Sequence, residues 1–204
     1  YTDIGGELAD RDFTHIRYPL LGTLFKPGRP RSHDQLAGAL LIHTLDIKQF
    51  VDRLLGQGHD VSSMILVNGR IPEDGVVPTE RDSPFMDTLD ALTRPDGHLP
   101  PWPRWWGPMI EDMLPDDAAR ERVLTEAKPV PRAVFDQPIP SPKLPGDVGL
   151  AFLALGEMYR PSFRTARDEG WAVTRLGGEH LHMVVDPVTV TGALLSLAGR
   201  AISQ

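Results

Sequence analysis

The amino-acid sequence predicts an α/β domain built on a mostly parallel sheet with helices on both faces. Two short and almost wholly apolar runs, residues 64–68 and 148–155, are typical of parallel strands that helices cover on both sides. Strand patterns alternate with helix patterns toward both ends of the chain, which indicates β-α-β units. A stretch rich in proline and tryptophan, residues 78–147, interrupts this alternation and predicts a cap inserted between two strands.

The first part of the core, residues 1–77, is predicted to contain two helices and two strands. The helix predictions depend on apolar residues that recur on one face, and the strand predictions on short apolar or alternating runs. In chain order they are a helix at 2–10, a strand at 13–19, a long helix at 34–55 and a strand at 64–68. A turn at 71–75 follows the second strand.

The cap, residues 78–147, is predicted to consist of extended loops and short helical turns. Proline cannot donate a backbone hydrogen bond and disfavours helix in the residue before it, so its density here excludes long helices. Two helical pieces remain, at 84–92 and at 116–127, the second with Asp116 or Asp117 as its N-cap.

The last part of the core, residues 148–204, alternates strand and helix patterns. The predicted elements are a strand at 148–155, a helix at 161–169, a strand at 170–176 and an amphipathic helix at 188–201. Regular structure therefore resumes after the cap, and the second half of the chain supplies two of the predicted parallel strands.

His180 is the leading candidate for a catalytic residue. It follows the glycine pair 177–178 at the carboxyl end of the last predicted strand, a common place for catalytic groups in open α/β sheets. Imidazole can accept and return a proton near neutral pH, because its unperturbed pKa is about 6.5. The alternative is a histidine that is merely hydrogen-bonded at a strand end. We expect the neighbouring His182 to be a packing residue.

Composition excludes several classes of function. The formal net charge is −7, which argues against nucleic acid or an anionic membrane as the main partner. There is no cysteine, so disulfides and thiolate chemistry are excluded. No apolar run approaches the roughly 20 residues that a membrane span needs, and we expect a cytoplasmic protein. High Arg, Pro and Asp usage is typical of a GC-rich bacterial source.

No metal or cofactor site is predicted. The histidines at 33, 43, 59 and 98 do not form a ligand spacing with nearby carboxylates. The glycine pairs lack the full dinucleotide-binding fingerprint and its strand–turn–helix context.

Three segments, residues 67–75, 99–106 and 170–187, together resemble the α/β-hydrolase superfamily, particularly its small bacterial esterase-like and lyase-like members. Over residues 1–55 the similarity is weaker. The resemblance implies a parallel sheet with a cap, and it makes His180, seven residues before Pro187, the general base.

The resemblance also implies an acid that orients the histidine. The family usually supplies it just after the penultimate strand, where Glu157 is the nearest carboxylate and Asp136 is a weaker candidate. The alternative for Glu157 is that it caps the next helix or faces water.

The family's nucleophile is not found in this sequence. A serine hydrolase needs a serine on a tight G-x-S-x-G turn between strand and helix, and no such motif occurs. The counterpart by position is 56–60, Gly-Gln-Gly-His-Asp, in which glycine replaces the nucleophile. Hydrolysis therefore requires a serine from a segment that the sequence does not contain, which we expect between Asp60 and Ser63.

Three functions follow from these observations. The first is hydrolysis of a small carboxylic ester or related carbonyl compound, with His180 as general base. The second is a non-hydrolytic relative, a cyclase or lyase, that uses His180 for proton transfer alone. The third is an inactive ligand-binding protein, which we expect to form a homodimer through an exposed sheet edge. In each, Trp102, Trp105 and Trp106 are predicted to line a lid over a small apolar or aromatic substrate, although they can equally supply core to the cap.

Overall fold

The computed structural model describes residues 61–77, 82–138, 141 and 143–203, together with the isolated positions 52, 55, 56 and 58. The predictions for residues 1–51 lie outside the described residues. Within the predicted long helix at 34–55, the described residues 52 and 55 are helical.

The core is a three-stranded parallel sheet in the order β1 (Ser63–Val67), β4 (Gly149–Leu155) and β5 (Ala172–Leu176). β4 is the central strand, with Val67 opposite Leu153 on one side and Leu155 opposite Leu176 on the other. All three strands coincide with predicted ones to within two residues. The predicted α/β class with a parallel sheet is therefore confirmed.

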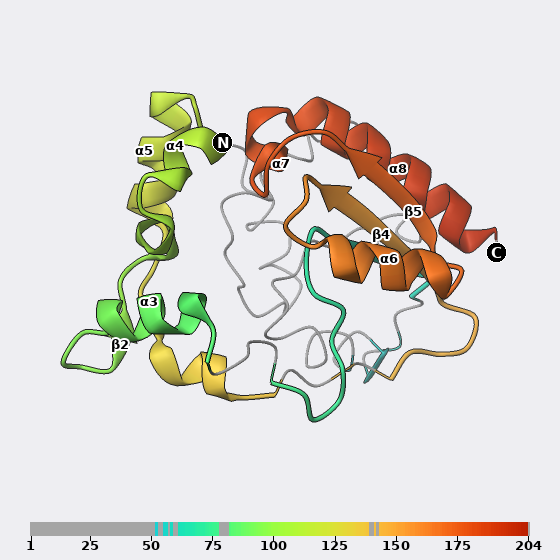
Figure 1. Ribbon diagram of the computed structural model, residues 1–204. Coiled ribbons are helices and arrows are strands. Elements are labelled where there is room, and N and C mark those ends of the chain that lie inside the picture. The colour runs from blue at the N-terminus through green and yellow to red at the C-terminus, as the bar shows by residue number, and fades with distance from the viewer. Residues whose placement is uncertain are drawn as a thin grey trace.

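Helices cover both faces of β4, as the continuous apolar run of that strand predicts. Ala151, Leu153 and Leu155 share a buried cluster with α8 (Pro187–Ile202), and Phe152 and Ala154 share another with α6 (Arg160–Asp168). Figure 1 shows α8 and α6 on opposite sides of the strands.

The structure confirms the amphipathic helix predicted at 188–201, which is α8. Its N-cap is Asp186, whose carboxylate accepts a hydrogen bond from the Thr189 N–H at 3.0 Å, and Pro187 occupies the first turn. Its buried residues recur at helical spacing on the face toward the sheet: Val190, Leu194, Leu197 and Ala201. Neither α8 nor any other helix in the described part of the chain is long and apolar enough to cross a membrane.

The connecting segment, which we define as residues 82–138, joins β1 to β4 through short elements. Both predicted helices are confirmed, α3 (Pro84–Leu92) with Ser83 as N-cap and α5 (Asp117–Glu126) with Asp116 as N-cap. The remaining elements are β2 (His98–Leu99), η4 (Trp102–Trp106), α4 (Met109–Met113), β3 (Val130–Pro131) and η5 (Arg132–Asp136). The two η elements are 3-10 helices of one or two turns, in keeping with the density of proline.

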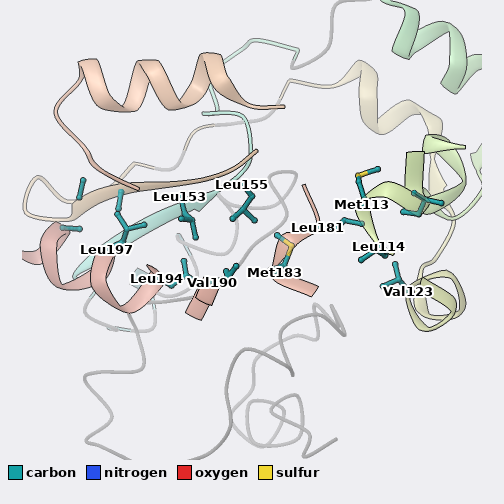
Figure 2. Close-up of a cluster of buried hydrophobic side chains, with 14 residues drawn as sticks. Met113, Leu114, Val123, Leu153, Leu155, Leu181, Met183, Val190, Leu194 and Leu197 are labelled. Atoms are coloured by element: carbon teal, nitrogen blue, oxygen red, sulfur yellow. The ribbon is translucent and has the colours of Figure 1, made fainter. Parts of the chain in front are cut away.

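A short helix that the sequence did not predict, α7 (His182–Val185), links the sheet to the connecting segment. Leu181 and Met183 belong to the same buried cluster as Met113 and Leu114. In Figure 2 they lie between the side chains of the connecting segment and those of the sheet and α8. The connecting segment therefore packs at the end of the sheet where the loop after β5 begins.

Candidate functional site

The carboxyl ends of the three parallel strands bring three polar or aromatic residues together. Asn68 directly follows β1, Tyr159 lies in the loop after β4, and His180 lies in the loop after β5. The arrowheads of β4 and β5 point toward α7 and the connecting segment (Figure 1). Because ligands of open α/β sheets bind beyond the carboxyl ends of the strands, this edge is the candidate site.

Asn68 is a buried polar residue at this edge of the sheet. Only 1% of its surface is exposed, and its φ of 42° is in the left-handed region, which asparagine tolerates better than most residues. Its backbone N–H donates to the Leu153 carbonyl at 2.7 Å, and its side-chain oxygen accepts from the Leu155 N–H at 2.8 Å. Asn68 is therefore held against β4 by two hydrogen bonds, one from its backbone and one to its side chain.

The other end of the Asn68 amide contacts His180. The Nδ2 atom of Asn68 lies 2.8 Å from Nδ1 of His180, which is half-buried. This hydrogen bond joins loops that follow two strands on opposite sides of β4. It restrains the position of the imidazole ring.

Gly156 allows the loop that carries His180 to approach β4. Its φ is 73°, and a Cβ atom at this position would overlap the carbonyl oxygen of Gly178. Its N–H also donates to the Leu176 carbonyl at 3.5 Å. A glycine is therefore required where the loops after β4 and β5 meet.

Two aromatic rings flank the imidazole. The ring centroid of Tyr159 lies 5.4 Å from that of His180, and the centroid of Trp106 lies 6.5 Å away. Burial raises the pKa of the Tyr159 phenol, an effect that the positive charge of Arg70 opposes. His180 is therefore bordered by an uncharged phenol from the sheet side and an indole from the connecting segment.

Sequence comparison does not add a functional assignment to this geometry. No protein-family model matches the chain. The curated proteins likewise contain no significant match to it. The function of this chain must therefore be inferred from the residues of the site.

Glu157, the predicted acid, pairs with arginines. Its carboxylate forms ion pairs with Arg175 and, at 3.7 Å, with Arg160, and its side chain is 57% exposed. Among the described residues, the group that contacts Nδ1 of His180 is Asn68. The weaker candidate Asp136 lies in η5, where it pairs with Arg132 at 3.3 Å.

The three predicted lid tryptophans lie in different surroundings. Trp106 is the one beside His180, and Trp102 packs with it against the cluster that joins the sheet and the connecting segment. Trp105 turns into a separate cluster, where it meets Phe135 edge-on at 5.4 Å and donates from its indole N–H to the Pro100 carbonyl. The structure thus brings Trp106 to His180 and gives Trp105 a packing position.

Two residues of the site carried no role in the sequence predictions, Asn68 and Tyr159. The available signal for Asn68 was a single amide residue at the end of an apolar run and directly before a glycine. Nothing in the pattern around Tyr159 singles it out. Within the part of the chain that the structure describes, no group of three or more His, Asp or Glu side chains could hold a metal ion.

Proposed function

We propose that this protein is an α/β-hydrolase-like enzyme that acts on a small carboxylic ester or related carbonyl compound, and that His180 is its catalytic histidine. The observation that carries the proposal is the hydrogen bond between the buried Asn68 and His180. A histidine at a strand end does not need a buried amide to fix its ring. A catalytic imidazole does, because its position relative to the substrate decides the rate.

The fold supports the same proposal. His180 follows the last strand of a parallel sheet, and the connecting segment packs against α7 immediately after it. In this proposal residues 1–77 and 148–204 form the α/β core, and residues 78–147 form the cap that encloses the substrate.

The neighbours of His180 indicate the kind of substrate. Tyr159 and Trp106 offer ring surfaces to an apolar or aromatic group, since large rings contribute most when they bury such surface. A small aromatic ester is the simplest compound that provides both this group and a carbonyl.

Hydrolysis also needs a nucleophile. The segment that the resemblance assigns to it, residues 56–60, lies mostly outside the described residues. In this form of the proposal a serine from outside the known sequence attacks the carbonyl, and His180 accepts its proton.

One observation favours a second candidate, a non-hydrolytic relative (a cyclase or lyase) that uses His180 for proton transfer alone. The partner of His180 Nδ1 is an amide NH₂ group, whereas a serine hydrolase uses a carboxylate that accepts from Nδ1. An NH₂ group cannot accept that hydrogen bond.

The proposal is tested by turnover of short-chain 4-nitrophenyl and 1-naphthyl esters by the full chain. We expect the His180→Gln variant, which keeps an acceptor for Asn68, to lose about a hundredfold or more of the activity. His98→Gln is the matched control, since His98 lies in β2 and bonds to Asp96. Equal activity of the His180→Gln variant would refute the catalytic role.

If no ester is cleaved, binding decides between the remaining functions. Tryptophan fluorescence would report binding of a naphthyl ester beside Trp106. Binding together with conversion of the compound to an isomer supports the second candidate, and binding without any product indicates a ligand-binding protein.

A further inference from the structure

The orientation of the Asn68 amide is determined by Leu155. A backbone N–H can only donate, so the amide atom that lies 2.8 Å from the Leu155 nitrogen must be the oxygen. The NH₂ group of Asn68 then faces His180, where it lies 2.8 Å from Nδ1. If the amide were rotated by 180°, its NH₂ group would face the Leu155 N–H, and two hydrogen-bond donors would meet without an acceptor.

From this geometry we infer that Asn68 is a positioning residue that holds His180 in the tautomer with its proton on Nε2, so that the site presents a hydrogen-bond donor to an oxygen atom of the ligand. The inference rests on the second candidate of the proposed function, in which His180 contacts the substrate without a serine nucleophile. It adds to that proposal the tautomer in which the His180 ring contacts the substrate. A ring with its proton on Nε2 and Nδ1 bonded to Asn68 has no lone pair with which to accept a proton from a serine.

The chemistry of imidazole gives this result directly. A neutral imidazole carries one N–H, and a nitrogen that accepts a hydrogen bond must be the one without the proton. Because Nδ1 accepts from Asn68, the proton is on Nε2. A proton on Nδ1 would instead point at the hydrogens of the Asn68 NH₂ group.

The tautomer determines which ligands suit the site. A ring with its proton on Nε2 can stabilise a carbonyl oxygen on which negative charge develops, as oxyanion-binding donors do. The nearby groups favour the same ligands, since Arg70 brings positive charge close to Tyr159 and the carboxylate of Glu157 is paired with two arginines. The ligand class is therefore an aromatic or other apolar molecule with a carbonyl oxygen or oxyanion.

The test is the nitrogen spectrum of His180 in the full chain labelled with ¹⁵N-histidine. At about pH 8, above the usual pKa of histidine, correlations between ring protons and nitrogens distinguish the two neutral tautomers. We expect Nε2 of His180 to be protonated, and a proton on Nδ1 would overturn the inference. The chain has a single asparagine, so selective labelling gives one side-chain NH₂ signal, whose contacts with the ring assign His180 without a variant.

The Asn68→Asp variant tests whether Asn68 is the cause. Aspartate has the same shape, and one of its oxygens can still accept from Leu155 while the other accepts from Nδ1 of His180. We therefore expect the proton to move to Nδ1. If Nε2 remains protonated in the folded variant, Asn68 does not set the tautomer; if the variant does not fold, the spectrum of the unaltered protein still decides.

The ligand class is tested with 2-acetylnaphthalene, an uncharged aromatic ketone. We expect the Asn68→Asp variant to bind it about tenfold more weakly than the unaltered protein, because the donor on Nε2 is lost, and His98→Gln to bind it equally well. Equal binding by the Asn68→Asp variant, or no binding by the unaltered protein, would overturn this ligand class. Failure of ester turnover alone would refute hydrolysis and leave the tautomer intact.

Discussion

Leu155 and Asn68 are joined by a hydrogen bond from a backbone N–H to a side-chain oxygen, at 2.8 Å, just beyond the last residue of β1. The side chain of Asn68 thus stands in for a backbone carbonyl and satisfies the last N–H of the central strand. The same amide fixes His180, so the end of the sheet and the candidate catalytic ring are stabilised by one side chain.

We expect Asn68→Ala to lower the free energy of unfolding by about 1–3 kcal/mol, because the Leu155 N–H is left without a partner. The left-handed backbone at this position adds to the loss in the alanine variant. Asn68→Gly loses the same hydrogen bonds but tolerates a positive φ, so its loss should be about 1 kcal/mol smaller. Urea denaturation measures both, and an unchanged midpoint in both variants would contradict the role of Asn68 in the sheet.

Gly149→Ala should be destabilised by about 1–3 kcal/mol, since a Cβ atom there would overlap the carbonyl oxygen of Ala201. This overlap would push the end of α8 away from the first residue of β4. Gly146→Ala is the matched control, because no atom lies within 4 Å of the position its Cβ would occupy. Thermal unfolding of the two variants should differ clearly, and similar melting temperatures would show that α8 shifts without cost.

The cap of α8 predicts a dependence of stability on acid pH. Hydrogen bonds from Thr189 lower the pKa of Asp186 from the usual value of 3.8. The bond from the Thr189 side chain has the larger effect, and the bond from its backbone N–H adds to it. A carboxyl whose pKa is lowered by folding stabilises the protein above its unfolded pKa, and this contribution is lost as pH falls through the folded pKa.

We therefore expect the difference in stability between the unaltered protein and Asp186→Asn to be larger at about pH 6 than at about pH 3. Denaturant unfolding at both pH values measures it. A difference that does not change with pH would show that the charge of Asp186 does not contribute.

Tyr159 predicts the opposite dependence at alkaline pH. Because burial raises its pKa above 10.0, its contribution to stability is present below that value and is lost as pH rises through the folded pKa. The stability of the unaltered protein should thus fall more steeply between about pH 9 and about pH 11 than that of Tyr159→Phe. Parallel curves for the two proteins would show that the phenol of Tyr159 is accessible to water.

The elements that could be predicted from the sequence are those with an unbroken local pattern. The apolar run of β4 and the spacing of Val190, Leu194 and Leu197 in α8 each identify one kind of structure. The loop position of His180 followed from the strand before it. The predicted N-cap, Asp116 or Asp117, located the start of α5.

The rest depended on contacts between distant parts of the chain. Asn68 and His180 are 112 positions apart, and no local pattern reveals that their side chains meet. The pairing of Glu157 with Arg175 likewise comes from the packing of two adjacent strands. Trp105 and Trp106 are neighbours in the sequence, yet the turn of η4 directs them to different clusters.

The dipeptide Asn68-Gly69 has a chemical consequence. An asparagine before a glycine loses ammonia readily, because the nitrogen of the small residue can attack the side-chain carbon. In the folded protein the hydrogen bonds to Leu155 and His180 hold that side chain away from such an attack. In molecules that unfold during storage, the cyclic imide formed as ammonia leaves is opened by water to aspartate or isoaspartate. Those that refold with aspartate would carry an acid in place of the amide, and their proton would move to the other ring nitrogen of His180.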